Sequence, residues 1–245
     1  MVAETAVVAG GGSGIGRGCA LHFAQRGHLV VLVGRTAAKL EATAGEIAAA
    51  GGEAEVWPLD LRDWEAVATL GEHLAATGVN LVVNAAGGQF AQPSARLSAN
   101  GWRAVIETNL TGSFFLLRHL YPALRKRRGA AVLVVADLWR RPAPGLAHAA
   151  AARAGVVSLV RTLALEWAGD GIRVNAVSPG LTDTPALRPE YAALVEAVPL
   201  GRLATVAEVV EAVDFLARAR YVTGEVLTVD GGLNLTAVSD GGAQP

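Results

Sequence analysis

The chain has 245 residues, of which 52% are apolar and 18% charged, and its formal net charge is −1 at pH 7. This composition suffices for one large α/β core, while the balanced charge gives no electrostatic reason to expect binding to nucleic acid or an anionic membrane. The single cysteine, Cys19, excludes an internal disulfide framework, and no apolar run approaches the length of a membrane span. The N-terminal residues also lack the pattern of a signal peptide. We therefore expect a cytoplasmic protein.

A glycine-rich turn joins the first predicted strand, Thr5–Ala9, to a helix that we place at Gly16–Gln25. Gly10, Gly14 and Gly16 allow the backbone to turn sharply and to approach a diphosphate closely. The helix then directs its free N–H groups toward that diphosphate. The pattern predicts a dinucleotide site, and a tight turn that binds no ligand is the alternative.

Strands alternate with helices along the rest of the chain, at a spacing typical of a parallel sheet covered on both faces. The further predicted strands are Leu29–Val33, Glu55–Pro58, Leu81–Asn84, Ala131–Ala136, Ile172–Val177 and Glu225–Val229. The further predicted helices are Thr36–Ala50, Asp63–Ala76, Ser98–Arg128 with a turn near Asn109, Leu146–Ala168 and Thr205–Ala217. We predict one doubly wound α/β domain over residues 1–237, with residues 238–245 as a loose tail. Such sheets bind ligands beyond the carboxyl ends of their strands.

The end of the second predicted strand, Val33-Gly34-Arg35, indicates which nicotinamide cofactor is used. NAD-binding folds usually place an acidic residue there to accept the ribose 2′-hydroxyl, whereas an arginine suits a 2′-phosphate. Gly34 removes the acid and Arg35 supplies a planar cation, so we expect NADP(H); a solvated Arg35 is the alternative. Asp60, at the end of the third strand, is positioned to accept a hydrogen bond from the adenine amine.

The order and spacing of these motifs resemble the short-chain dehydrogenase/reductase family, over about residues 3–235. The likeness is carried by Ala9–Gly16, Asp60-Leu61, Asn84–Gly87, Asn109, Asn175–Gly180 and Asp230–Gly232. It implies a single-domain Rossmann-type fold. The family often has threonine where Ala9 stands and aspartate where Asn80 stands. Three stretches, residues 84–90, 101–112 and 148–156, are similar to the peroxisomal trans-2-enoyl-CoA reductase branch, whose members reduce a conjugated C=C bond with NADPH.

The resemblance also implies which residues hold NADP(H). The backbone after Asn84 flanks the cofactor, while Leu181 and Thr184 hold the nicotinamide amide through a backbone group and a hydroxyl. The predicted cofactor residues are Gly10, Gly12, Ser13, Gly14, Ile15, Gly16, Arg35, Asp60, Leu61, Asn84, Ala85, Ala86, Gly87, Arg153, Pro179, Gly180, Leu181 and Thr184. We predict no metal site.

The chain departs from the family at the residues that carry the reaction. Family reductases combine a serine, a tyrosine that transfers the proton, a lysine that lowers the tyrosine pKa and an upstream asparagine. Those positions are occupied here by Ala136, Ala149, Arg153 and Asn109. A positioned general acid contributes about 10²–10⁴-fold in rate, so ordinary ketone reduction should be badly impaired. Arginine can still hold ribose hydroxyls but does not deprotonate in a protein.

Two residues beside the vacated positions, His148 and Asp137, are candidates for a substitute proton donor. A surface histidine and an aspartate that caps a turn are the alternative interpretations. Reduction of a conjugated bond tolerates the loss better, because the enolate needs hydrogen-bond donors at its oxygen and water can then protonate carbon. Asn109 and nearby backbone N–H groups are candidate donors.

Several functions remain open at this point. The leading prediction is an NADPH-dependent reductase of an activated C=C or C=N bond. A non-redox cyclase or isomerase, a catalytically silent partner subunit and an ordinary ketoreductase are the alternatives. Leu187, Tyr191, Leu194 and Val195 share a helical face after Gly180 and suit a small apolar or aromatic substrate. The small residues of Ala147–Ala154, together with the family likeness, favour a homo-oligomer, either a tetramer or a dimer.

Overall fold

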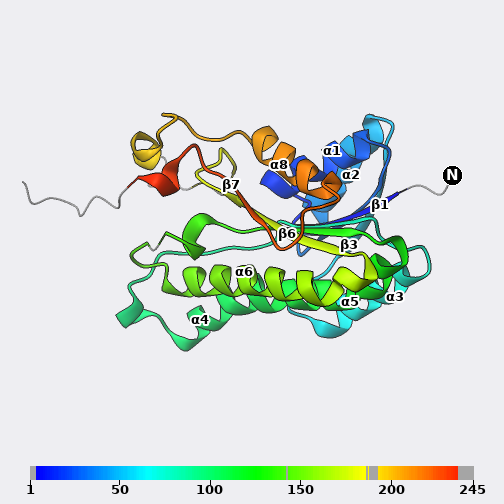
Figure 1. The fold of residues 1–245 in the computed structure, drawn as a ribbon, viewed down its shortest axis with the longest axis horizontal. Coiled ribbons are helices and arrows are strands. Elements are labelled where there is room, and N and C mark those ends of the chain that lie inside the picture. The colour runs from blue at the N-terminus through cyan, green and yellow to red at the C-terminus, as the bar shows by residue number, and fades with distance from the viewer. Residues whose placement is uncertain (1–3, 142, 186, 188–192, 237–245) are drawn as a thin grey trace, which may run out of the picture.

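The computed structural model describes residues 4–141, 143–185, 187 and 193–236, which form one α/β unit around a seven-stranded parallel sheet (Figure 1). The strand order is β3-β2-β1-β4-β5-β6-β7. The strands are β1 (Thr5–Ala9), β2 (Leu29–Gly34), β3 (Glu53–Pro58), β4 (Leu81–Asn84), β5 (Ala130–Val134), β6 (Arg173–Pro179) and β7 (Val226–Val229). The α-helices are α1 (Gly14–Gln25), α2 (Ala37–Ala49), α3 (Trp64–Ala75), α4 (Ala99–Ile106), α5 (Gly112–Arg127), α6 (Ala147–Trp167) and α8 (Val206–Arg218).

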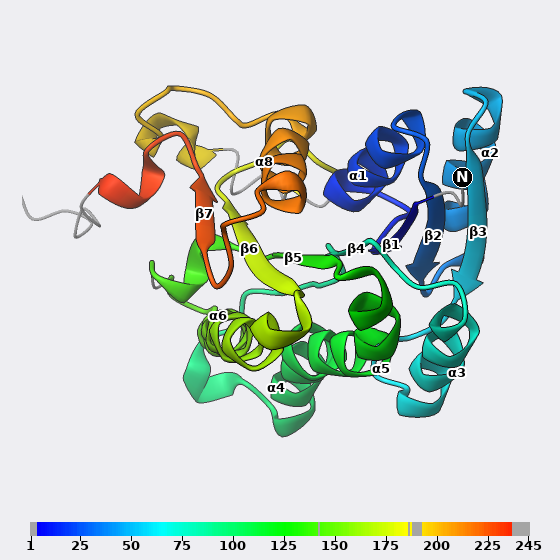
Figure 2. The same cartoon turned by 45° about the vertical axis from the view of Figure 1, so that its right-hand side comes forward.

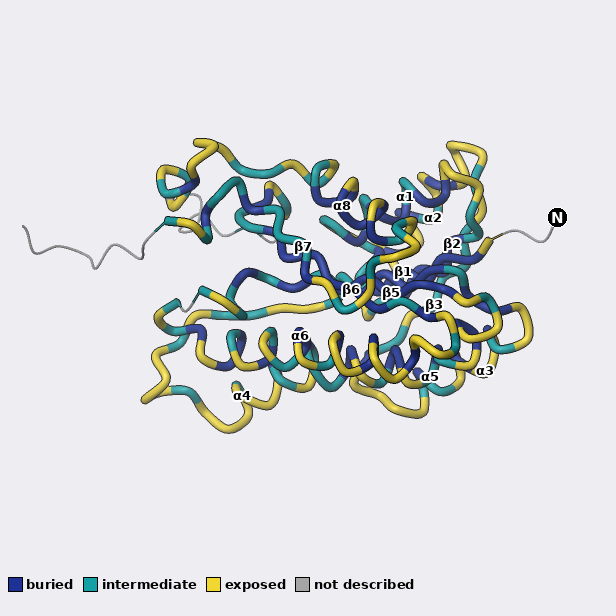
Figure 3. Tube along the Cα trace, in the orientation of Figure 1, coloured by how far each residue is buried: buried dark blue, intermediate teal, exposed yellow. Residues whose placement is uncertain are grey.

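The sheet divides the core into two layers, because successive side chains of a strand point to opposite faces. In β1, Ala6 and Val8 belong to one buried cluster, while Val7 and Ala9 belong to the other. Helices α1, α2 and α8 cover the first face, and α3, α4, α5 and α6 lie on the second (Figures 1 and 2). Buried residues follow the strands and the inner sides of these helices (Figure 3). Within the described residues, no helix is both long and apolar enough to cross a bilayer.

The doubly wound α/β fold predicted from the sequence is confirmed, with several shifted boundaries. Strand β5 ends at Val134 rather than at Ala136, because the chain turns there into the short 3₁₀ helix η3 (Asp137–Trp139). The turn predicted near Asn109 is a π-helical turn, η2 (Glu107–Thr111), that joins α4 to α5 without a break. In the expected substrate cover, Tyr191 lies outside the described residues and Ala193–Ala197 forms a 3₁₀ helix. The predicted tail also lies outside them.

Two helical glycines provide a matched test of this packing. Gly71 in α3 lies against α5, where an added Cβ would stand 2.5 Å from the His119 carbonyl oxygen. Gly45 in α2 is exposed, and an added Cβ would meet no atom within 4 Å. We expect Gly71→Ala to lower the free energy of unfolding by about 1–3 kcal/mol through overpacking. Gly45→Ala should raise it by about 0.4–1 kcal/mol through loss of unfolded-state entropy.

Guanidinium-chloride unfolding of the two variants beside the wild type measures both effects. Equal losses of stability in the two variants would contradict the close packing of α3 on α5.

Candidate functional site

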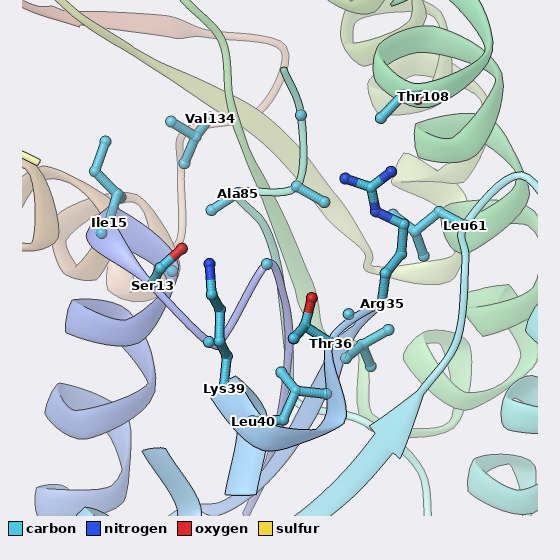
Figure 4. A pocket seen from close by; sticks show the side chains of 18 of the residues that line it. Ser13, Ile15, Arg35, Thr36, Lys39, Leu40, Leu61, Ala85, Thr108 and Val134 are labelled. Carbon is cyan, nitrogen blue, oxygen red and sulfur yellow. The ribbon is translucent and has the colours of Figure 1, made fainter. Parts of the chain in front are cut away.

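A cavity of about 320 Å³ opens at the carboxyl ends of β1, β2 and β4. Figure 4 shows its side chains converging from the glycine-rich turn, the start of α2 and the loops after β3 and β4. Thirteen of the predicted cofactor residues line it, namely Gly10, Gly12, Ser13, Gly14, Ile15, Gly16, Arg35, Asp60, Leu61, Ala85, Ala86, Gly87 and Thr184. The sequence pattern therefore identified most of one physical cavity.

The glycine-rich turn depends on backbone positions that no other residue could fill. Gly10 has φ +79°, and a Cβ there would stand 2.8 Å from the Ala85 carbonyl carbon. A Cβ on Gly16 would collide with the Gly10 carbonyl oxygen. Helix α1 thus begins directly under the turn, and its first N–H groups face the cavity as they do in sites that bind a diphosphate.

The side of the cavity formed by the end of β2 is cationic. Arg35, Thr36 and Lys39 all line it, and in Figure 4 they project into the same space, with Ser13 nearby. The Thr36 hydroxyl makes no capping hydrogen bond to the start of α2, so it is available to a ligand. Sequence reasoning selected Arg35 alone and missed Lys39, although a residue in the first turn of the helix after β2 must lie at this edge.

Asp60 forms an ion pair with Arg62, which the sequence analysis did not predict. Arg62 donates to its carboxylate through Nε (3.0 Å) and Nη2 (2.6 Å). These hydrogen bonds from Arg62 lower the pKa of Asp60, and the more distant charge of Arg35 acts in the same direction. The carboxylate is thus fixed in its ionised form at the mouth of the cavity, and retains acceptor capacity for an amine.

Asn84 shapes the site from behind instead of lining it. Its Oδ1 accepts the Ala86 N–H (3.1 Å), and its Nδ2 donates to Ser113 Oγ (2.9 Å). The Ser113 hydroxyl in turn donates to the Asn109 carbonyl oxygen (2.6 Å). This chain of bonds fixes the turn after β4 relative to α5, so that backbone groups of Ala85–Gly87 face the cavity.

The loop after β6 contributes less of the cavity wall than predicted. Thr184 and Pro185 line the cavity, whereas Pro179, Gly180 and Leu181 do not. Gly180 packs against Asp230, where a Cβ would stand 2.8 Å from the Asp230 Cα.

Asn109 and Arg153, two of the predicted catalytic residues, meet at the Gly87-Gly88 turn. The Asn109 side chain accepts the Gly88 N–H (3.2 Å) and donates to the carbonyl oxygens of Gly88 and Val105 (both 2.8 Å). Arg153 Nη2 would stand 2.8 Å from a Cβ on Gly87, and Nη1 donates to the Val134 carbonyl oxygen (3.2 Å). The Asn109 amide is thus occupied in holding backbone, whereas most Arg153 donors are not.

Asp137 begins η3, directly after the position where the family has its serine. It is 8% exposed, and neither carboxyl oxygen accepts a hydrogen bond from the described residues. Burial, followed by the negative charge of Asp230, raises the pKa of Asp137; the positive charges of Arg140 and Arg141 act in the opposite direction. A carboxyl group with a raised pKa retains its proton to higher pH, which suits a general acid.

His148 lies in an apolar environment beside Ala149. It is fully buried, neither ring nitrogen has a hydrogen-bond partner among the described residues, and its ring meets Phe90 edge-on at 4.6 Å. Burial lowers the pKa of His148, so the imidazole is neutral near pH 7. Neither His148 nor Asp137 lines the cavity, and the directions of their pKa shifts favour Asp137 as the acid.

The comparison with protein families agrees with this architecture. The family model described as Enoyl-(Acyl carrier protein) reductase matches residues 9–234. This range includes the glycine-rich turn and strands β2 to β7. The chain belongs to the short-chain dehydrogenase/reductase family. Among curated members of the family, the "Probable 2,4-dienoyl-CoA reductase" of Bacillus subtilis is 36% identical over 248 residues, covering 95% of this chain and 97% of that protein.

Solved structures of the short-chain dehydrogenase/reductase family share the fold closely. A citronellol catabolism dehydrogenase of Pseudomonas aeruginosa is 40% identical with a TM-score of 0.85, covering 94% of this chain and 95% of the other. A structure from Beutenbergia cavernae, described as an NAD(P) dependent gluconate 5-dehydrogenase with bound NADP at low occupancy, is 38% identical. Its TM-score is 0.90, and the match covers 96% of this chain and 98% of the other.

The tyrosine position of the short-chain dehydrogenase/reductase family is filled here by apolar packing. Ala149 is completely buried with Val105 and Leu146, and Phe90 and Leu138 pack against this cluster. The alanine is therefore a packed core residue, and this part of the site offers no hydroxyl group to a substrate.

We expect His148→Leu to raise the free energy of unfolding by about 1 kcal/mol, because it removes a buried polar ring without partners. His148→Gln, which leaves a polar amide in the same place, should give no such gain.

The lowered pKa of His148 also makes the stability of the protein depend on pH. The unfolded chain binds a proton below about pH 6.5 that the native state excludes, so the wild type loses stability as pH falls below that value. Denaturant unfolding at pH 7.5 and 5.5 should show a smaller loss in the leucine variant.

Proposed function

We propose that this protein is an NADPH-dependent reductase of an activated C=C bond, with reduction of a C=N bond as a variant of the same chemistry. The observation that carries the proposal is the cavity wall at the end of β2, where Arg35 and Lys39 stand and Gly34 replaces the usual acid. Two cations suit a 2′-phosphate and leave the 2′-hydroxyl of NAD without its acceptor. When bound, the cofactor would supply the hydride.

The residues present favour a conjugated bond over a simple ketone. A ketone needs a proton at its oxygen as hydride arrives, and neither Ala136 nor Ala149 can donate one. In a conjugated substrate the proton goes to carbon after the charge has moved to oxygen, so the demand for a strong acid at oxygen is weaker. The name of the Bacillus subtilis relative, a 2,4-dienoyl-CoA reductase, supports this choice.

Within this proposal the chain's own residues have distinct roles. The glycine-rich turn and the start of α1 hold the diphosphate, and Asp60 is available to the adenine amine. Thr184, which lines the cavity beside Gly14, would hold the nicotinamide amide through its hydroxyl. Asn109 positions the Gly87-Gly88 turn, and Asp137 supplies the proton. His148 contributes packing.

A non-redox cyclase or isomerase is the second candidate, and the apolar filling around Ala149 favours it. We further propose that the substrate is small and apolar or aromatic, and that the protein is a cytoplasmic homo-oligomer. A catalytically silent partner subunit is a third candidate for the function. Exposed Phe114 on α5 and Leu165 on α6, which is 83% exposed, support an interface on this face of the sheet. No feature of the charge pattern favours nucleic acid.

Arg35→Ala tests cofactor selection. Loss of one charge-assisted hydrogen bond to phosphate costs about 1.5–3 kcal/mol, so the dissociation constant for NADPH should rise roughly 10- to 100-fold while that for NADH changes little. Titration followed by nucleotide fluorescence gives both constants, with Arg103→Ala, an exposed arginine of α4, as control. Equal weakening of the two cofactors would show that Arg35 does not read the phosphate, and failure of the wild type to bind either one would favour the non-redox candidate.

Asp137→Asn tests the proton donor. The amide keeps the size of the side chain but cannot donate the acidic proton, so kcat for a conjugated substrate should fall about 10²–10⁴-fold. Wild-type kcat should also decline as pH rises through the raised pKa of Asp137, because the acid form is the active one. The asparagine variant should show a flat profile over the same range. A variant that keeps both the rate and the pH profile would assign the proton to water.

A further inference from the structure

Arg153 is a cation that lies beside the cavity wall at Gly87, without a counter-charge among the described residues. No acidic side chain among the described residues forms an ion pair with it, and burial alone lowers its pKa, to about 10. Of its five N–H donors, the hydrogen bond to the Val134 carbonyl oxygen uses one. Nε is enclosed without a partner, while the side chain as a whole keeps partial exposure. Such a group is costly to bury unless something negative joins it.

The place of the guanidinium shows what could join it. It lies between the carboxyl end of β5 and the turn after β4, with Nη2 against Gly87, which lines the cavity. The absence of a Cβ on Gly87 makes this approach possible, because a Cβ would stand 2.8 Å from Nη2 and 2.5 Å from Asn109 Oδ1. Arg153 does not itself line the cavity, but its Nη2 reaches the wall at Gly87.

The other three positions of the family's catalytic set cannot receive a negative oxygen. The side chains of Ala136 and Ala149 carry no donor, and both amide hydrogens of Asn109 are directed at backbone carbonyls. Arg153 therefore holds the unused side-chain donors of this group, in a planar fork that matches an oxyanion.

We infer that Arg153 receives a negatively charged oxygen that is conjugated to the bond being reduced. The inference rests on the proposed function and names the substrate class of that site, a conjugated carbonyl compound. When bound, NADPH would supply a hydride to the β-carbon of such a substrate, and the π electron pair of the C=C bond would then leave negative charge on the carbonyl oxygen. Arg153 holds this enolate oxygen until the α-carbon takes a proton from Asp137 and the carbonyl re-forms. An unsaturated carboxylate would bring the same charge before reaction.

Arg153→Met tests the assignment, with Arg161→Met as the matched control. Arg161 lies on the same helix and is exposed. The probes are a neutral thioester, S-crotonyl-N-acetylcysteamine, and the anion crotonate. If the substrate oxygen becomes charged only during the reaction, kcat for the thioester should fall about 10²–10³-fold in Arg153→Met. The NADPH dissociation constant of this variant should change less than about twofold. Arg153→Lys, which keeps the charge, should restore part of the rate, and Arg161→Met should match the wild type.

Crotonate tests whether the substrate itself carries the negative charge, as a carboxylate, before the reaction begins. If the substrate is a permanent carboxylate, the wild type should reduce crotonate and Arg153→Met should raise its KM, with little change in kcat. If Arg153→Met weakens NADPH binding and leaves turnover at saturation intact, the inference is overturned, because the residue then holds the cofactor alone.

Thermal unfolding of the cofactor-free protein gives a readout independent of catalysis. Arg153→Met should raise Tm, because an uncompensated charge leaves the interior, and crotonate at millimolar concentration should raise Tm in the wild type only. A lower Tm in Arg153→Met, with no response of the wild type to crotonate, would show that the charge is already compensated. A wild type that reduces neither probe but shows both thermal effects would overturn the proposed reductase function and leave the oxyanion site standing.

Discussion

The contact between the glycine-rich turn and the turn after β4 is the constraint on which the site depends. Gly10 lies so close to Ala85, and Gly16 to the Gly10 carbonyl, that no side chain could intervene. Parallel pairing of β1 with both β2 and β4 brings the two turns to one edge of the sheet. The start of α1, the cations after β2 and the backbone after β4 consequently enclose a single cavity. Each element of that cavity is local in sequence, and only the sheet register joins them.

The same topology explains the charges at the opposite edge of the sheet. Helices that connect parallel strands direct their carboxyl ends, with their negative dipole ends, to the edge where the strands begin. A groove there is lined by Arg26, Arg127, Arg128, Arg173, Arg218 and Arg220. Arg173 donates to the carbonyl oxygens of Leu216, Ala217 and Ala219 at the end of α8, and Arg26 and Arg218 pair with Asp214. These arginines mainly complete helix ends and are neutralised from within, whereas Arg35 and Lys39 at the other edge line an open cavity.

The reaction end of the site combines apolar packing with charges that lack partners. Around Ala149 the usual polar set is replaced by core side chains, which also enclose His148. Within the part of the chain that the structure describes, the Asp137 carboxyl accepts no hydrogen bond and Arg153 Nε has no partner. Unsatisfied buried groups reduce stability, and groups of this kind are often found at sites where a ligand completes their interactions. The tyrosine position is therefore apolar, but an acidic and a cationic side chain remain in its neighbourhood.

The sequence by itself determined the α/β fold, the glycine-rich turn, the cation at the end of β2 and the absence of the family's proton donor. These features are local patterns of backbone geometry and residue type, and they need no knowledge of distant neighbours. Only the tertiary structure decided that Lys39 joins Arg35, that Asn84 and Asn109 hold backbone, and that burial raises the pKa of Asp137 and lowers that of His148. Burial, hydrogen-bond partners and pKa shifts depend on residues far apart in the chain. The charge of Arg153 belongs to this second class, because only the fold shows that no carboxylate of the described residues forms an ion pair with it.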